Sequence, residues 1–122
     1  MRDTELIQMR PTIPLSIEDS TPIEAFQNTT LRPILKLQHE LLVAVFKHYT
    51  IFRKNAFIQV PKKDRPAYIE NSIKTDLKFK NRLIGIIIGH FTLEEYIFFQ
   101  EHETELVRRT TDLIIQRIQS AF

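Results

Sequence analysis

Apolar residues recur at intervals of three and four along most of this chain, the spacing that places side chains on one face of an α-helix. Residues 31–54 hold the first long pattern and residues 92–120 hold the second. The first predicts an apolar face made of Leu31, Ile34, Leu35, Leu41, Leu42, Val45, Tyr49 and Phe52. The second predicts an apolar face made of Leu93, Tyr96, Ile97, Val107, Ile114 and Ile118. Two long amphipathic helices are therefore expected.

Helix start signals predict three shorter helices. Thr21, Pro22 and Glu24 form a capping pattern that begins a short helix near the N-terminus. Asp64 is placed to cap a third helix, and Asp76 is placed to cap a fourth that ends near Ile88. With only two glycines in 122 residues, the chain lacks the turn residues that an all-β protein needs. The sequence therefore predicts an all-α fold: a bundle of about four helices, two of them long, with a short N-terminal helix.

The first 20 residues show no helical period and contain Pro11 and Pro14. Residues 1–20 are therefore predicted to be an extended N-terminal arm, and residues 21–122 a single helical domain. Ile13, Leu15 and Ile17 alternate with polar or turn-forming residues, which suits packing across a hydrophobic groove.

Both glycines lie in the stretch LIGIIIGHFTLEEY, residues 83–96. A phosphate-binding loop would need a preceding strand and a following lysine with serine or threonine, and this stretch has neither. Gly89 is predicted to end a helix in the left-handed conformation, and Thr92 with Glu95 to begin the next by a capping box. Gly85 and Gly89 are four residues apart, so they are expected to allow another backbone to come close.

Composition argues against several kinds of functional site and against secretion or membrane insertion. Without cysteine, the chain has no disulfide, thiolate metal ligand or cysteine nucleophile. The N-terminal residues show no signal-peptide pattern, and no apolar run approaches the roughly 20 residues of a membrane-spanning helix. A cytoplasmic protein without membrane association is predicted.

Polar residues fall inside both predicted apolar faces: Gln38 and His48 in the first, and Gln100, Glu103, Thr104 and Thr111 in the second. The candidate ligand-binding residues among them are Gln38, His48, Gln100 and Glu103. One interpretation is a polar ligand-binding pocket around Glu103, because a buried carboxylate needs partners or becomes neutral. The other is a closed structural network that fixes the register of the helices, or a rim position at which Glu103 reaches water.

Charge is unevenly distributed although the net charge is only +2. Nine basic and three acidic residues lie between Arg53 and Arg82, whereas five acidic residues and no lysine or arginine lie between Glu94 and Glu105. Nucleic-acid binding is one hypothesis for the basic part, through Lys74, Lys78, Lys80 and Arg82. A solvated helix face is the alternative, and the low net charge favours it.

No catalytic residue, metal site or cofactor is predicted. A bundle dimetal site needs two Glu-x-x-His motifs, and none is present. Val43, Phe46 and Phe98 fall on the charged sides of the two long helices, where either the N-terminal segments or another subunit must cover them. A homo-oligomer is therefore expected.

The stretches EAFQNTTLRPILKLQHELL and AYIENSIKTDLKFKNRLIGIIIGHFTLEEY resemble a small family of all-helical bacterial proteins of unknown function. Members of that family sometimes carry a glyoxalase label. The resemblance implies a shared helical fold and supplies no catalytic residue, because a glyoxalase I fold is rich in strands and holds its metal by His and Glu from its sheet.

The residues together favour a non-catalytic interaction or structural module. A ligand-binding or enzymatic bundle with a pocket around Glu103, and a nucleic-acid binder using residues 74–82, are the alternatives.

Overall fold

Every regular element in the described part of the chain is helical, and the all-α prediction is confirmed there. The computed structural model describes residues 1–12, 21–53 and 56–122. Its helices are α1 (Arg2–Met9), α2 (Pro22–Phe26), α3 (Arg32–Leu37), α4 (His39–Phe52), α5 (Ala56–Gln59), α6 (Arg65–Thr75), α7 (Leu77–Ile88), α8 (Leu93–Glu101) and α9 (Glu103–Gln119). A π-helical turn (Gln27–Leu31) joins α2 to α3, and a 3-10 turn (Lys62–Asp64) precedes α6.

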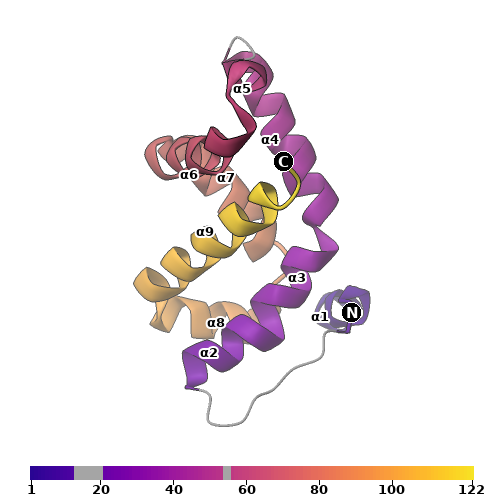
Figure 1. The fold of residues 1–122 in the computed structure, drawn as a ribbon. Helices are drawn as coiled ribbons and strands as arrows, with labels where there is room; N and C mark the ends of the chain where they lie inside the picture. Colours follow the sequence, from indigo (N-terminus) through magenta and orange to yellow (C-terminus); the bar gives the residue numbers. More distant parts are fainter. Residues whose placement is uncertain (13–20, 54–55) are drawn as a thin grey trace.

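Helix α9 forms the centre of the molecule. It packs against α3, α4, α6 and α7, and Figure 1 shows it crossing between them. Leu106, Ile114 and Ile118 are at most 1% exposed. Burial of such aliphatic side chains contributes about 1.5–3 kcal/mol each. The core is therefore assembled around one helix that is contacted on several sides, and the predicted bundle of about four helices is not confirmed.

The predicted first long helix is interrupted at Gln38. Segments α2, the π-helical turn, α3 and α4 follow one helical path in Figure 1, but Gln38 has φ −97° and ψ 9°, outside helical values. Beyond this break α4 buries Leu42, Phe46 and Thr50. Part of the predicted apolar face is left in solvent instead, with Leu41 46% and Phe52 74% exposed.

Aromatic packing decides which face of α4 is buried. Phe46 is fully buried, with its ring 5.4 Å from that of Phe57 and 5.7 Å from that of Phe122. Elements of the same chain therefore cover Phe46, and neither an N-terminal arm nor a second subunit is needed there.

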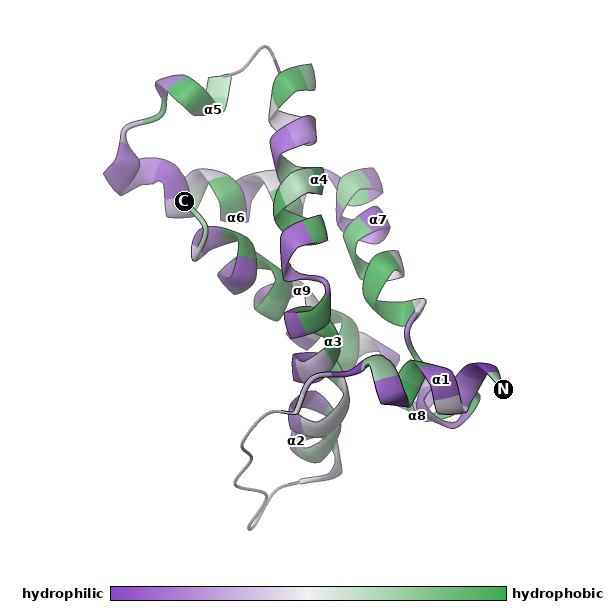
Figure 2. Cartoon of the chain, turned by 90° about the vertical axis from the view of Figure 1, so that its right-hand side faces the viewer, coloured by the Kyte–Doolittle hydropathy of each residue, from purple (hydrophilic) through white to green (hydrophobic). Residues whose placement is uncertain are grey.

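The predicted last helix is also divided, at His102, where φ is −130° and ψ is 34°. Helix α8 packs through Phe98 and Phe99, and the Phe98 ring stacks on Phe26 of α2 at 5.0 Å. The predicted apolar face of α8 points outward, with Leu93 67% and Ile97 57% exposed. Apolar residues are therefore left in solvent near both breaks. Figure 2 shows hydrophobic and hydrophilic turns side by side along the helices.

The N-terminal arm is not extended over its first part, which is a correction to the sequence prediction. Residues Arg2–Met9 form α1, which buries none of its residues. Helix α1 is instead held to the joint between α7 and α8 by polar contacts. The alternating residues Ile13, Leu15 and Ile17 lie outside the described residues.

Local start signals are largely confirmed. Thr21, Asp76 and Thr92 each accept a hydrogen bond from a backbone N–H in the first turn, and Thr92 forms the predicted capping box with Glu95. Asp64 precedes α6 without such a bond. Gly89 has φ −58°, so the predicted left-handed conformation is wrong.

Candidate functional site

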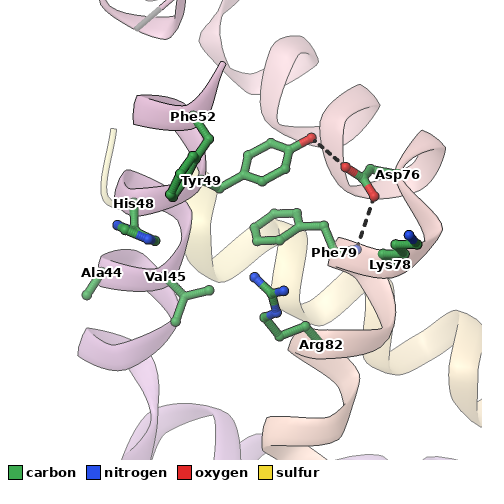
Figure 3. A pocket seen from close by; sticks show the side chains of 9 residues that line it. All are labelled: Ala44, Val45, His48, Tyr49, Phe52, Asp76, Lys78, Phe79 and Arg82. Atoms are coloured by element: carbon green, nitrogen blue, oxygen red, sulfur yellow. Dashed lines mark hydrogen bonds between the residues drawn. The ribbon is translucent and has the colours of Figure 1, made fainter. Parts of the chain in front are cut away.

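A hollow with a volume of about 710 Å³ lies between α4 and α7. Its first wall comes from α4. Val45, His48 and Phe52 stand three and four residues apart, so they share one face of the helix, and Figure 3 shows them on α4, across the gap from Phe79 and Arg82 of α7. We call this hollow the α4–α7 groove.

The second wall comes from the start of α7. The ring of Phe79 stacks on that of Tyr49 with 3.9 Å between centroids and 11° between planes, and this pair forms an aromatic floor. Lys78 and Arg82 line the edge, and the guanidinium of Arg82 projects into the gap between the helices in Figure 3. The groove therefore combines an apolar floor with a basic edge.

Asp76 lies at one end of the groove, and both of its carboxylate oxygens accept hydrogen bonds. Its carboxylate accepts hydrogen bonds from the Phe79 N–H at 3.1 Å, the Tyr49 hydroxyl at 3.1 Å and the Arg53 guanidinium at 2.8 Å. The pKa of Asp76 is lowered, first by the Phe79 N–H and then by Tyr49 and Arg53, against the opposing effect of desolvation. Burial and the neighbouring carboxylate raise the pKa of Tyr49. Asp76 therefore anchors α7 and leaves Lys78 and Arg82 as the available charges.

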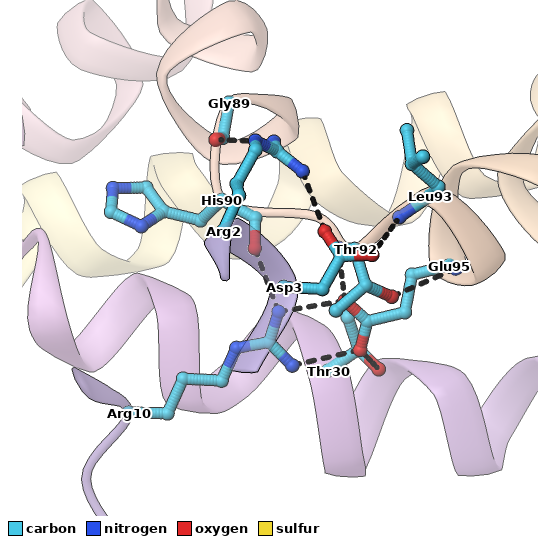
Figure 4. Close-up of polar contacts among 9 residues, drawn as sticks. All are labelled: Arg2, Asp3, Arg10, Thr30, Gly89, His90, Thr92, Leu93 and Glu95. Atoms are coloured by element: carbon cyan, nitrogen blue, oxygen red, sulfur yellow. Dashed lines mark hydrogen bonds and ion pairs between the residues drawn. The ribbon is translucent and has the colours of Figure 1, made fainter. Parts of the chain in front are cut away.

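A second polar cluster joins α1 to the start of α8, as Figure 4 shows. The guanidinium of Arg10 donates to both carboxylate oxygens of Glu95, at 2.7 and 2.6 Å, and to the His90 carbonyl at 2.7 Å. Glu95 also accepts from the Thr92 N–H at 2.8 Å and from the Thr30 hydroxyl at 3.0 Å. The side chains of Arg10 and Glu95 are only 9% and 18% exposed.

The titration of this cluster follows from its contacts. Burial on its own would raise the pKa of Glu95, but Arg10, Thr92 and Thr30 outweigh it, so the pKa is lowered. The pKa of His90 is lowered by burial and then by Arg10 and Arg2. A neutral His90 ring can accept a hydrogen bond at Nε2, and the Gln38 amide makes that contact. Most polar atoms of this cluster are paired with one another, as in a structural joint, whereas Arg10 Nε and His90 Nδ1 are buried without a partner among the described residues.

The structure does not bring the four predicted ligand-binding residues together. Gln38 contacts His90, and His48 lines the α4–α7 groove. Gln100 and Glu103 are exposed, near the end of α8 and at the first position of α9. The break at His102 explains this placement, because it takes Glu103 out of the face that a continuous helix would bury.

The predicted basic set is divided between two helices. Lys74 lies on α6 and pairs with Glu70 at 2.8 Å, whereas Lys78, Lys80 and Arg82 lie on α7. Lys80 is half-buried, and only Lys78 and Arg82 line the groove. Nucleic-acid binding by residues 74–82 stays an untested prediction.

Sequence reasoning missed the two contacts that organise these sites. Arg10 lies in the segment that was predicted to be extended, and its pairing with Glu95 spans 85 residues. The stacking of Tyr49 on Phe79 depends on the relative placement of two helices. One sequence feature could have indicated the groove: the aromatic residue Phe79 lies between Lys78 and Lys80, three residues after the Asp76 cap.

Two further findings bear on the kind of site. Within residues 1–12, 21–53 and 56–122, no group of three His, Asp or Glu side chains is placed to hold a metal ion. Over the same ranges, no helix has both the length and the apolar character that a membrane crossing requires.

Comparisons of this chain with protein-family models, curated proteins and solved structures gave no significant match. The resemblance to the bacterial helical family therefore stays a prediction, and function has to be argued from the geometry.

Proposed function

We propose that this protein is a non-catalytic interaction module, and that the α4–α7 groove binds an amphipathic helix that carries acidic residues beside its apolar face. The observation that carries the proposal is the juxtaposition in this groove of an exposed apolar wall with two basic side chains, Lys78 and Arg82.

The apolar wall supports binding of a hydrophobic partner surface. Phe52 is 74% exposed. Leu41 is 46% exposed and lies on the same side of α4, because Ala44 follows it by three residues and Val45 by four. Covering this surface removes apolar area from water, which is favourable by about 25 cal/mol per Å² before the cost of association. Docking of a helix into an apolar groove is a recurrent way of using such a surface.

The basic edge supports an acidic partner. Lys78 and Arg82 are exposed, and neither takes part in an ion pair within the described part of the chain. They stand four residues apart on one side of α7, so together they form a basic edge for acidic residues on a docked helix. Such charges mainly increase the rate of encounter and the specificity of pairing.

Asp76 is not free to act as a general base in this groove. A general base must be free to take a proton, and this carboxylate already accepts three hydrogen bonds that favour its charged form. The groove therefore offers binding surface and charge, and its one carboxylate stabilises the start of α7.

A small amphipathic anion is a second candidate occupant, favoured by the groove volume of about 710 Å³. Small-molecule sites have volumes of about 300–1,000 Å³ and combine apolar walls with a few polar groups. The sequence suggested a ligand pocket around Glu103. The groove that could hold a small ligand is instead lined by His48.

Fluorescence anisotropy with a labelled helical peptide tests the proposal. The probe carries leucines on one face and glutamates beside them, and a matched peptide carries lysines in place of the glutamates. We expect Arg82→Glu and Phe52→Ser to weaken binding of the acidic peptide by about tenfold or more, a change of about 1.4 kcal/mol. Lys62→Glu and Ile58→Ser are the matched controls, because both residues are exposed outside the groove.

Binding that is equal for the two peptides, or equally reduced in the controls, would overturn the proposal. Displacement of the acidic peptide by decanoate, together with tight binding of decanoate itself, would favour the small-anion alternative.

A further inference from the structure

A second apolar surface lies on α8. Leu93, Tyr96 and Ile97 are 67%, 42% and 57% exposed, and their spacing of three and four residues places them on one face. They belong to the face that the sequence predicts to be buried, and they are exposed because α8 packs through Phe98 and Phe99 instead.

This α8 surface is acidic where the groove is basic. Glu94 and Glu101 are exposed, and their spacing of seven residues puts both along one edge of the apolar stripe. Neither forms an ion pair with another described residue. Glu95 points away from this edge and is bound by Arg10.

We infer that the occupant of the α4–α7 groove is α8 of a second copy of this chain, with Leu93 and Ile97 against the apolar wall and Glu94 and Glu101 facing Lys78 and Arg82. This inference rests on the proposed function, since it names the partner of the same groove.

Three features favour a second copy as the partner. The two surfaces have opposite charge, and each carries exposed apolar residues on a helix of at least nine residues. In its own chain α8 is fixed by packing of Phe98 on Phe26, with its apolar stripe directed outward. The stripe can therefore be covered from outside without any change in the fold.

Open space along α7 also suits this contact. Gly85 stands three residues after Arg82, and a Cβ built on it would meet no atom within 4 Å. A docked helix can therefore come close to this part of α7.

Because the groove and α8 are different surfaces, each copy offers both halves of the contact. A contact of a single helix in a groove lies at the small end of protein interfaces, so association in the micromolar range is expected. The opposite charges further imply that association weakens as salt is added.

Sedimentation velocity over a concentration series tests the inference. The groove variant is Arg82→Glu, the α8 variant is Ile97→Lys with Glu101→Lys, and Lys62→Glu is the control because Lys62 is exposed outside the groove. We expect the wild-type chain and the control to self-associate, and each interface variant to lose association by about tenfold or more. Far-UV circular dichroism confirms that each variant is folded.

Mixing the two variants gives the decisive measurement. The α8 variant keeps an intact groove and the groove variant keeps an intact α8, so their equimolar mixture is expected to regain association as a 1:1 complex. A mixture that stays monomeric, a monomeric wild-type chain, or an α8 variant that associates like the wild type would each overturn the inference.

The same variants separate this inference from the proposed function. The α8 variant should still bind the acidic peptide, because its groove is unchanged. If the peptide binds while the wild-type chain stays monomeric, the proposed function stands and the second copy is not the partner. If the groove variant alone loses self-association and the α8 variant keeps it, a different segment of the second copy occupies the groove.

Discussion

The guanidinium of Arg10 donates two hydrogen bonds, of 2.7 and 2.6 Å, to the carboxylate of Glu95, although the two residues are 85 positions apart in the chain. This pair ties α1 to the capping box that begins α8, so one carboxylate serves both the helix start and the N-terminal segment. Since α1 buries none of its own residues, its position depends on these polar contacts.

Arg10→Gln should loosen α1 and destabilise the fold. Loss of the cation leaves a mostly buried carboxylate with fewer partners, at a cost of about 1–3 kcal/mol. Chemical denaturation measures this change, and hydrogen exchange should become faster across residues 2–9. Arg2→Gln is the matched control, because its side chain is 54% exposed, and it should cost much less. Equal effects of the two variants would contradict the role given to Arg10.

The lowered pKa of His90 predicts that the free energy of unfolding decreases on mild acidification. Its pKa in the folded protein lies below the ordinary value of 6.5, so the unfolded chain binds the proton more readily. The free energy of unfolding should therefore fall as the pH drops below about 6.5, and level off below the folded pKa. Urea denaturation between pH 8 and pH 5 measures this slope, which His90→Gln should reduce and the exposed-site variant His48→Gln should retain.

Glu95 is expected to cause a separate decrease in the free energy of unfolding at lower pH. Its pKa is below the ordinary value of 4.5, so its contribution is present above that value and is lost as the pH falls through the folded pKa. Glu95→Gln should flatten the acid part of the stability profile, and an unchanged profile would contradict the assignment.

Gly85→Ala should stabilise the protein. Gly85 lies inside α7, and the added methyl group meets open space, so the gain in helix propensity of about 0.5–1 kcal/mol is expected in full. Gly89→Ala should gain less, because its Cβ would approach the Gly85 carbonyl oxygen at 3.3 Å. Thermal denaturation compares the two variants. A loss of about 1 kcal/mol for Gly89→Ala would instead favour the left-handed conformation predicted from sequence.

Thr110 and Thr111 form a matched pair at the centre of α9. The hydroxyl of Thr111 donates to the Val107 carbonyl at 2.7 Å, whereas that of Thr110 is buried without a partner among the described residues. Thr110→Val should therefore raise the free energy of unfolding by about 1 kcal/mol, because an unpaired buried hydroxyl is removed. Thr111→Val should be neutral or destabilising. Both are read from urea denaturation, and a destabilised Thr110→Val would mean that its hydroxyl has a partner in solution.

The sequence by itself determined the helical class and the starts of α2, α7 and α8, because both depend on residues within about four positions of each other. Asp76 and Thr92 cap their helices through the N–H groups of Phe79 and Glu95, three residues on. Such bonds join residues a few positions apart, so local sequence indicates where they can form, although Asp64 makes none.

Only the tertiary structure decided which helix faces are buried. A period of three and four residues identifies an apolar side but cannot rank two apolar sides of one helix. On α4 the aromatic contacts of Phe46 with Phe57 and Phe122 bury one side, and Phe52 is left exposed as a wall of the groove.

The same holds for α8 and for both candidate surfaces. Phe98 and Phe99 pack inward, so Leu93 and Ile97 face solvent beside acidic residues. The breaks at Gln38 and His102 separate Gln38 and Glu103, which a pair of straight antiparallel helices would have brought near each other. Contacts between residues far apart in the chain, such as that of Arg10 with Glu95, depend on the whole fold and leave no mark on local periodicity.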